Sequence, residues 1–434
     1  MADDDDNDDE DFILLGIVAT CTRILSTQRR SWRCQLTIAH RHFRSSTIRR
    51  AALQDPNDSA WTTLFNSGLD DSLITITGFN YWAFETLHQK FAELFNTYTP
   101  YNREGTSIKK TRKHSGRKRL LSSRMALGLV LTWARTRGSL YILQLIFGIT
   151  SSPLSLWLRF SRRLLTLVLL RDKRSKVEMP TREEVDKYSS IVEDAYPSLT
   201  RVWGAMDGLK VLIEASTDDS IQRRFYNGWT HDHYITNIFL FAPDGRIRAS
   251  YINAPGCLHD STLAIWSGIY DKLNEAYNEH GGRVVVDSAF SRHKGEALIK
   301  SYQTNMDRTG RRRQRHRLNK DATSLRQMSE WGMHGLQASF PRLRDRLRYE
   351  EQGERKIIMQ LIVLLYNFRA STVGQNQIQS VFMPHLERNT NHYMLRGWVE
   401  LHMMTKRKAT SCLAANRVAP KSDVASTPLL LFYF

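Results

Sequence analysis

The chain has 434 residues, of which 41% are hydrophobic and 10% aromatic, enough to bury a core over two or three domains and to exclude a disordered polymer. Its formal net charge is +18. A surplus of this size favours an anionic partner, nucleic acid first, although a basic protein without such a partner stays an alternative.

The cysteines and the apolar segments exclude several further classes. The four cysteines lie far apart and form no CxxC pair, which argues against a disulfide framework or a cysteine zinc site. The acidic start, MADDDDNDDEDF, is unlike a secretory or mitochondrial leader. The apolar stretch 153–170 contains three arginines, which a spanning helix would not tolerate. We therefore expect a soluble protein without a membrane partner.

The first part of the chain gives one clear helix and one basic run. Residues 1–70 begin with acidic residues and then show no clear period. From Phe79 to Phe95, apolar residues recur at helical spacing and predict an amphipathic helix. The basic run at 109–119 is either a solvated linker or a segment that contacts phosphates or directs nuclear import. Its candidate DNA-binding residues are Lys109, Lys110, Arg112, Arg117, Lys118 and Arg119.

Helical patterns follow at 123–135, at 139–147 and from Pro153 onward. Gly148 can end one helix, and Ser151 or Ser152 can cap the next. A short turn with glycine between two helices is typical of a helix-turn-helix. An ordinary helical hairpin that buries its apolar faces explains the same pattern. In the first interpretation, the residues on an exposed, DNA-facing side would be Ser155, Arg159 and Arg162.

From about Leu199, short strand-like runs replace the helical patterns. The run RVWGAMDGLKVLIEAS predicts a strand, a turn at Asp207-Gly208 and a second strand. The next run predicts two strands joined by a hairpin turn at 243–245. A helix at 259–273, a strand at 283–286 and helices at 324–337 and 354–369 complete the order. This order predicts an α+β fold, a ribonuclease-H-like mixed sheet flanked by helices.

Three carboxylates fall at positions that can converge. Asp207 is predicted at the end of the first strand, Asp287 at the end of the fourth, and Glu330 in a following helix. If the first and fourth strands are neighbours, their carboxyl ends meet at one edge of the sheet. Carboxylates are preferred ligands of Mg²⁺ and Mn²⁺, and two ions about 4 Å apart promote phosphodiester cleavage. We therefore predict Asp207, Asp287 and Glu330 as metal-binding and catalytic residues.

Three other polar groups remain open. Asp260 is either a helix N-terminal cap or a further acidic side chain beside the metal cluster. The histidines at 231 and 233 lack a third ligand at a zinc-like interval, so their segment is predicted as a loop that approaches DNA or braces the acidic site. The arginines of 311–317 predict a loop that holds the DNA backbone, or a flexible charged insertion. The candidate DNA-binding residues here are Arg311, Arg312 and Arg313.

The motifs AMDGLKV, YNGWTHDHY, FAPDGRI, NAPGCLHDS, VVVDSAF and SEWGMHGLQASFPRL, taken together and in this order, resemble the DDE domain of PIF/Harbinger-type transposases and the nucleases domesticated from them. The resemblance covers roughly residues 199–370. It implies a ribonuclease-H-like fold, two Mg²⁺ or Mn²⁺ ions, and cutting and joining of double-stranded DNA at transposon ends. By position it assigns the metal-binding carboxylates to Asp207, Asp287 and Glu330, with Asp260 at another acidic position of the family.

The resemblance also implies the organisation and the partners. A helical, helix-turn-helix-like region precedes the nuclease, a Myb-like accessory protein and a homo-oligomer are expected, and the protein would act in the nucleus. The resulting domains are an acidic and undetermined segment (1–70), a helical DNA-binding-like domain (71–195), a nuclease (196–372) and a C-terminal extension (373–434). The alternatives are a catalytically silent, domesticated DNA-binding protein that retains the fold, and an enzyme that cuts RNA–DNA hybrids.

Overall fold

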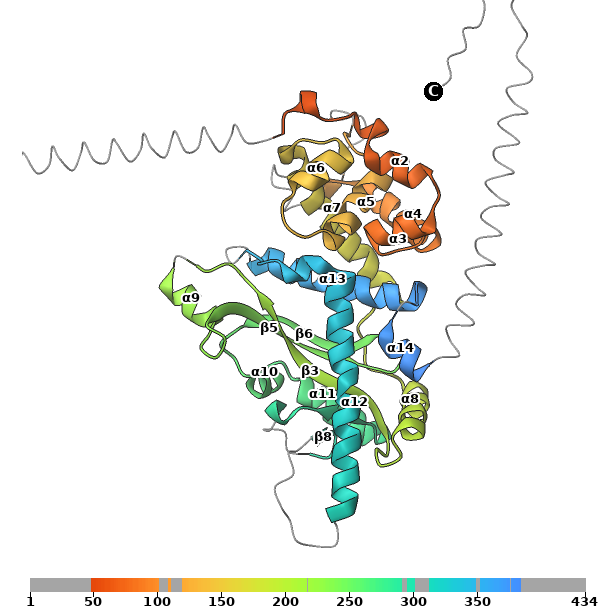
Figure 1. Ribbon diagram of the computed structural model, residues 1–434, viewed down its shortest axis with the longest axis vertical. Coiled ribbons are helices and arrows are strands. Elements are labelled where there is room, and N and C mark those ends of the chain that lie inside the picture. Colours follow the sequence, from red (N-terminus) through yellow and green to blue (C-terminus); the bar gives the residue numbers. More distant parts are fainter. Residues whose placement is uncertain are drawn as a thin grey trace, which may run out of the picture.

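The computed structural model describes residues 48–100, 108–110, 119–216, 218–290, 295–300, 312–348, 352–374 and 376–383. Helices α2 to α7 form one end of the molecule, and a mixed sheet with its flanking helices forms the other (Figure 1). Helix α13 lies between the two parts and contacts α7 on one side and β6 on the other. The arrangement confirms the predicted α+β class.

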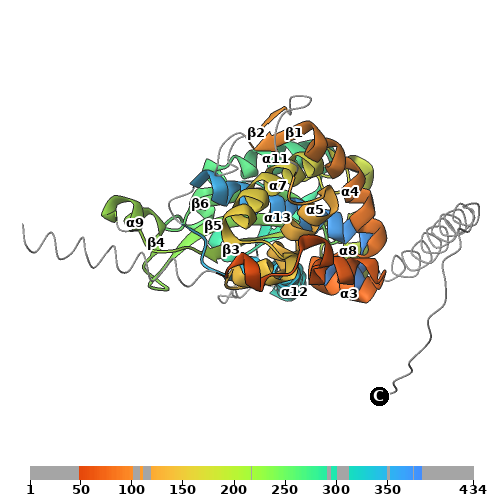
Figure 2. The ribbon, with the colours of Figure 1, turned by 90° about the horizontal axis from the view of Figure 1, so that it is seen from above.

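The helical end has a core rich in aromatic rings. The Trp61 ring stacks on Phe147 at 5.2 Å and contacts Phe84 at 6.0 Å. Gly128 makes room for it, because a Cβ there would lie 2.1 Å from the Trp61 ring. Viewed from this end, α5 and α7 lie over α13 (Figure 2). The elements are α2 (Ala60–Asn66), α3 (Asp70–Thr77), α4 (Tyr81–Thr97), α5 (Ser123–Arg135), α6 (Tyr141–Phe147) and α7 (Ser151–Arg171), with the short ribbon β1 (Tyr98–Pro100) and β2 (Ile108–Lys110).

The predicted helices of this part are confirmed with one wrong cap. The helix expected at 79–95 is α4, and α5 has the predicted bounds. Gly148 ends α6 in the left-handed conformation, with φ at 63°. The cap of α7 is Thr150, whose extended backbone precedes the first helical residue, so the prediction of a cap at Ser151 or Ser152 is wrong.

The middle of α7 is core rather than surface. Helices α6 and α7 meet at 89° across a short turn, as two helices of a helix-turn-helix can. Ser155 is exposed and Arg159 is half-buried. Arg162, however, is buried: its guanidinium lies over the Trp133 ring and pairs with Glu354 of α13 at 3.0 Å. The prediction that Arg162 faces DNA is therefore wrong, because α13 covers that side of α7.

The C-terminal helices are long and central. They are α12 (Arg312–Ser339), α13 (Gln352–Thr372) and α14 (Gln377–Phe382). Helix α13 and its continuation are long and apolar enough to cross a membrane, but 78% of that apolar window is buried inside the protein. Such burial is typical of a core helix. Helix α12 begins at Arg312, so the prediction of a loop over the arginines that follow Arg311 is wrong.

The sheet has the strand order β6–β5–β3–β7–β8, with β4 paired to the start of β5. Strands β3, β5 and β6 are antiparallel, and β7 and β8 run parallel to β3. Hydrophobic clusters cover the two faces of the sheet. The strands are β3 (Val202–Leu212), β4 (Tyr226–Asn227), β5 (Asp232–Phe241), β6 (Ile247–Pro255), β7 (Arg283–Val286) and β8 (Leu298–Lys300), flanked by α8 (Arg182–Ala195), α9 (Asp219–Phe225), α10 (Asp260–Trp266) and α11 (Ile269–His280).

Two local predictions in the sheet region are wrong. The turn expected at Asp207-Gly208 is absent, because β3 runs straight through and Gly208 pairs with Ile238 as an ordinary strand residue. The single helix expected at 259–273 is two helices, separated at Gly268, which has a φ of 68°. The hairpin at 243–245 and the strand β7 are as predicted.

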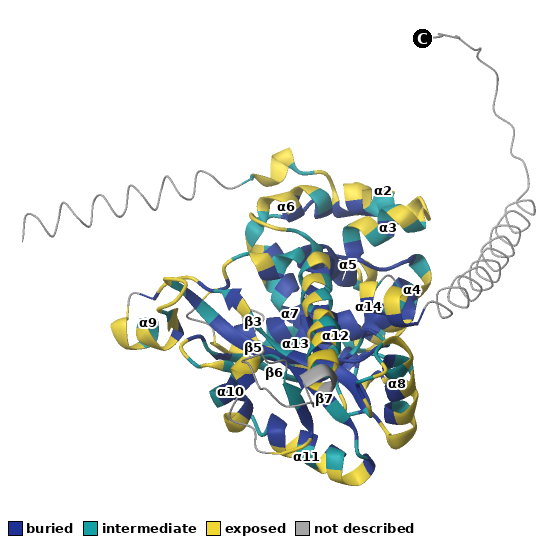
Figure 3. Ribbon diagram, turned by 60° about the horizontal axis from the view of Figure 1, so that its bottom comes forward, coloured by how far each residue is buried: buried dark blue, intermediate teal, exposed yellow. Residues whose placement is uncertain are grey.

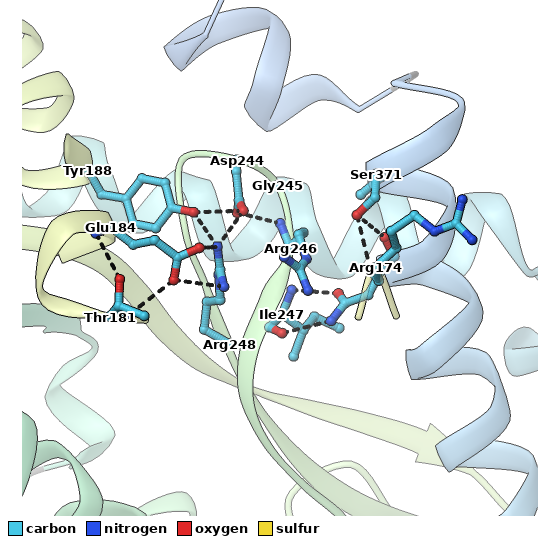
Figure 4. Close-up of polar contacts among 12 residues, drawn as sticks. Arg174, Thr181, Glu184, Tyr188, Asp244, Gly245, Arg246, Ile247, Arg248 and Ser371 are labelled. Carbon is cyan, nitrogen blue, oxygen red and sulfur yellow. Dashed lines mark hydrogen bonds and ion pairs between the residues drawn. The ribbon is translucent and has the colours of Figure 1, made fainter. Parts of the chain in front are cut away.

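A buried polar network ties the β5–β6 hairpin to the helices beside it (Figure 4). Arg248 is buried and donates to Asp244 at 2.7 Å and to Glu184 of α8 at 2.9 Å. Glu184 also closes the capping box of α8 with Thr181. Arg246 donates to two backbone carbonyls that precede α8. The hairpin that leads into β6 is thus fixed by charge-assisted hydrogen bonds.

Candidate active site

Asp207 and Asp287 lie at equivalent positions on two neighbouring parallel strands. The last residues paired between β3 and β7 are Met206 and Val286, so the two aspartates are the next residues on neighbouring strands. The backbone N–H of Gly208 donates to Asp207 at 2.7 Å, and that of Ser288 donates to Asp287 at 2.7 Å. Strand β7 ends there while β3 continues, which leaves the Asp207 carboxylate beside an open sheet edge.

Helix α12 brings a third carboxylate and a cation to the same edge. Arg326 Nη1 lies 4.0 Å from Asp207 Oδ2 and 3.8 Å from Asp287 Oδ2. Its Nη2 lies 3.0 Å from Glu330 Oε1, one turn further along the helix. One guanidinium therefore lies among carboxylates from three separate elements. The structure thus brings Asp207, Asp287 and Glu330 around the same guanidinium, each within 4.0 Å of it.

Asp260 completes the cluster from the other face of β3. Its carboxylate occupies the space that a side chain at position 208 would fill: a Cβ on Gly208 would lie 2.7 to 2.8 Å from its carboxyl atoms. The N-cap of α10 is His259, and no side-chain cap bond is formed. The prediction of Asp260 as the N-cap is therefore wrong, and its place in a metal cluster stays a prediction, which its position next to Gly208 favours.

Asp207 and Asp260 are held at raised pKa values. Burial raises the pKa of Asp207 to about 6, and the negative charges of Asp287 and Asp260 add to that shift against the opposing effects of Gly208 N–H and Arg326. Burial, with Asp287 nearby, also raises the pKa of Asp260. Closely placed carboxylates repel one another, so the cluster gains stability from any cation that enters it.

We expect Gly208→Ala to disturb chemistry far more than folding. The new methyl group would displace the Asp260 carboxylate by roughly 1 Å, and a misplacement of that size can cost on the order of 10²-fold in rate. The change in unfolding free energy should stay below about 1 kcal/mol, because Gly208 is in a strand without positive φ. Single-turnover cleavage of labelled duplex and urea unfolding measure the two effects. Gly353→Ala, with open space around it, is the matched control; an unchanged cleavage rate in Gly208→Ala would remove Asp260 from the site.

The side chains around Arg326 are carboxylates, whose charge and oxygen atoms suit a divalent cation. In the residues that the structure describes, no three acidic, histidine or cysteine side chains are grouped closely enough to hold a metal ion. Arg326 takes the place of a cation among the carboxylates instead. The residues that would hold a metal are Asp207, Asp287 and Glu330, with Asp260 beside them.

The other predicted site residues that the structure describes lie on β2, before α5, on α7 and at the start of α12. Lys109 and Lys110 are exposed on β2. Arg119 packs on the Phe95 ring and donates to the carbonyls that end α4. Arg159 lies on α7, and Arg312 and Arg313 are in the first turn of α12. Arg112, Arg117, Lys118 and Arg311 lie outside the described residues.

The two histidines that could have suggested zinc do not share a site. His231 precedes β5 with a φ of 53° and bonds the Tyr226 hydroxyl at 3.1 Å. His233 is buried within β5. Asp232, between them, forms a two-bond pair with Arg346 instead.

Sequence reasoning missed Arg326 and Gly208. The i, i+4 spacing of Arg326 and Glu330 on one helix face was the available signal for an ion pair. It could not show that the same guanidinium reaches two strands. The sequence predicts a turn at Gly208, whereas a glycine within a strand often marks a close approach by another group.

Comparison with known protein families finds a match in the middle of the chain. Residues 206–367 match the family described as DDE superfamily endonuclease, and the match includes all four acidic residues and Arg326. No curated protein and no solved structure matches the chain. DDE endonuclease domains generally use divalent metals. Residues 206–367 are therefore similar to DDE superfamily endonucleases, a similarity that suggests a nuclease- or transposase-like function for this part of the chain.

Proposed function

We propose that the protein is a metal-dependent DNA endonuclease of the PIF/Harbinger transposase type, which cuts and joins phosphodiester bonds at transposon ends. The observation that carries the proposal is the convergence of Asp207, Asp287 and Glu330 on one cationic position. The match of this region to DDE superfamily endonucleases supports the same activity. Three antiparallel strands followed by helices and a parallel fourth strand support a ribonuclease-H-like fold.

In this proposal the carboxylates act as a rigid cradle for the metals. Asp207 is fixed by a backbone hydrogen bond in the middle of a long strand, and Asp287 is fixed at the end of its neighbour. When bound, two Mg²⁺ or Mn²⁺ ions supply activation of the attacking water or 3′-hydroxyl and stabilise the leaving oxygen. Arg326 balances the negative charge of the cradle until cations replace it.

The proposed substrate is double-stranded DNA, and the basic composition supports it. The net charge of +18 favours phosphate contacts. Helices α6 and α7 meet at 89°, which supports a helix-turn-helix-like role limited to the exposed Ser152 and Ser155 near the start of α7. A Myb-like accessory protein, a homo-oligomer that cuts two ends together, and action in the nucleus complete the proposal.

Incubation of the full-length protein with end-labelled duplex DNA tests the activity. We expect cleavage with Mg²⁺ or Mn²⁺ and none with EDTA. Without metal, the carboxylates cannot activate the attacking water or 3′-hydroxyl, and they cannot stabilise the leaving oxygen. Asp271→Asn, an exposed acidic residue of α11 outside the cluster, is the control and should cut like the wild type. Absence of cleavage in every metal, with DNA binding intact, would instead favour the silent DNA-binding alternative. Preferential cutting of an RNA–DNA hybrid would overturn the duplex substrate.

A further inference from the structure

The most exposed large hydrophobic side chain among the described residues is Trp229, with 91% of its surface open to solvent. It lies on a projection that we call the arm, residues 218–233, made of α9, β4 and the turn that enters β5. Figure 3 shows α9 standing away from the end of the sheet with a largely exposed surface. A single exposed hydrophobic side chain is common on protein surfaces, so a binding role for Trp229 depends on how the ring is held and on what lies near it.

The turn that carries Trp229 is held by its own side chains. Asn227 Oδ1 accepts hydrogen bonds from the backbone N–H of Trp229 at 3.1 Å and of Thr230 at 3.3 Å. The Tyr226 hydroxyl bonds His231 across the turn at 3.1 Å. Hydrogen bonds thus hold the turn that carries the indole in one conformation. The turn therefore loses little conformational entropy when Trp229 binds a partner.

The base of the arm is fixed to the body of the protein. Asp232 and Arg346 form hydrogen bonds of 2.8 and 2.7 Å. Phe225 is buried, and the guanidinium of Arg355 from α13 lies 5.1 Å from its ring centroid. The distance between the arm and the acidic cluster is therefore set by the fold.

The arm follows β3, the strand that carries Asp207, along the chain. Strand β3 continues from Asp207 to Leu212, which pairs with Tyr234 next to the arm. Five residues of strand span about 17 Å, which equals roughly five base pairs of DNA. A duplex cut at the acidic cluster would reach the arm about half a helical turn from the scissile phosphate.

The chemistry of the arm suits nucleic acid better than a protein surface. Lys210 is exposed on β3 between the cluster and the arm, and Arg223 and Arg224 are exposed on α9. The chain neighbours of Trp229 are Gly228 and Thr230, both exposed, so the turn itself adds no apolar side chain of the kind that enriches the core of a protein interface. One aromatic face with nearby cations is the usual platform for stacking a nucleic-acid base.

We propose that Trp229 stacks on an unpaired base of the DNA substrate, about half a helical turn from the cut site, while Arg223 and Arg224 pair with its phosphates. This inference rests on the proposed function, since it places the unpaired base on the same DNA that the acidic cluster cuts. Base stacking tolerates any sequence because every base has a π-face. Trp229 thus recognises strand separation rather than a sequence.

Binding of the full chain to DNA with a 2-aminopurine in an unpaired site tests this, in EDTA so that no cleavage occurs. Mixed-sequence duplexes of about 30 base pairs, fully paired or with an unpaired 2-aminopurine about five base pairs from the centre, and single strands serve as probes. The wild type should bind the unpaired duplex about 10-fold more tightly than the paired one, and quench its fluorescence. Trp229→Ala should lose both effects, and Trp229→Phe should retain most of them. Trp82→Ala, half-exposed on α4, is the control and should match the wild type.

The outcomes separate this inference from the proposed function. A protein that cuts DNA with metal, yet shows equal quenching and equal preference in Trp229→Ala, overturns the stacking role alone. A protein that binds no DNA overturns both. A loss of affinity in Trp229→Ala that is the same for paired and unpaired probes shows a phosphate or groove contact and overturns recognition of unpaired bases. Circular dichroism checks that each variant is folded.

Discussion

Asp207→Asn is expected to abolish metal-dependent cleavage while it makes the metal-free protein more stable. The asparagine keeps the shape of the side chain but removes a charge that would hold a metal ion, and such charge stabilisation accounts for several kcal/mol, or on the order of 10³-fold in rate. Without metal, the same charge is unfavourable, because it is buried beside Asp287 and Asp260.

The stability effect depends on pH in a defined direction. Folding raises the pKa of Asp207 from 3.8 to about 6, mainly through burial. The folded protein therefore binds the proton more tightly than the unfolded chain. Stability linked to Asp207 is fully present below pH 3.8 and is lost as pH rises through about 6. At pH 7.5 the loss amounts to at most about 3 kcal/mol, which the asparagine avoids.

Urea unfolding in EDTA at pH 4.5 and pH 7.5 measures this difference. The Asn variant should exceed the wild type at pH 7.5 and approach it at pH 4.5. Addition of Mn²⁺ should raise the stability of the wild type at pH 7.5 and leave the variant almost unchanged. Asp271→Asn controls for loss of any surface carboxylate. An Asn variant that is less stable than the wild type in EDTA at pH 7.5 would show that Asp207 is favourably paired, and the charge-repulsion account of the site would be wrong.

Arg248→Met is expected to destabilise the fold by about 3 to 5 kcal/mol, the usual cost of breaking a buried ion pair by removing one partner. Arg248 is only 2% exposed, and its guanidinium serves Asp244, Glu184 and the Tyr188 hydroxyl at once. Methionine fills most of the volume but leaves Asp244, itself largely buried, without its cation. The β5–β6 hairpin would lose its ion pair with Glu184 of α8 and keep only the hydrogen bond of 2.8 Å from Tyr188 to Asp244 among the contacts of this network with α8.

Urea unfolding at pH 7 measures the loss, and a double-mutant cycle assigns its cause. In the Arg248→Met background, Asp244→Asn should recover a part of the stability, because it removes the uncompensated charge. Arg182→Met, an exposed arginine on α8, should change the unfolding free energy by less than about 0.5 kcal/mol. A double variant as unstable as the sum of the two single changes would mean that the arginine stabilises the fold by packing and not by charge.

The sequence alone determined the elements whose signals are local. The apolar period of α4, the bounds of α5, the left-handed Gly148 and the hairpin at 243–245 follow from side-chain periodicity and turn chemistry within a few residues. The order of strands and helices also placed Asp207, Asp287 and Glu330 where they could meet. These predictions succeeded because each depends on neighbours along the chain.

The tertiary structure alone decided what each side chain meets across the fold. Pairing with β5 keeps β3 extended through Asp207-Gly208, a dipeptide that by itself favours a turn. Packing against α13 buries Arg162, although the sequence of its helix is otherwise compatible with DNA binding. Asp260 lies over Gly208, and Arg326 lies among three carboxylates. These contacts join residues up to 119 positions apart in the chain. The physical reason is that burial and Coulomb energy depend on distance in space, and a periodic pattern carries no information about which distant element fills the space beside it.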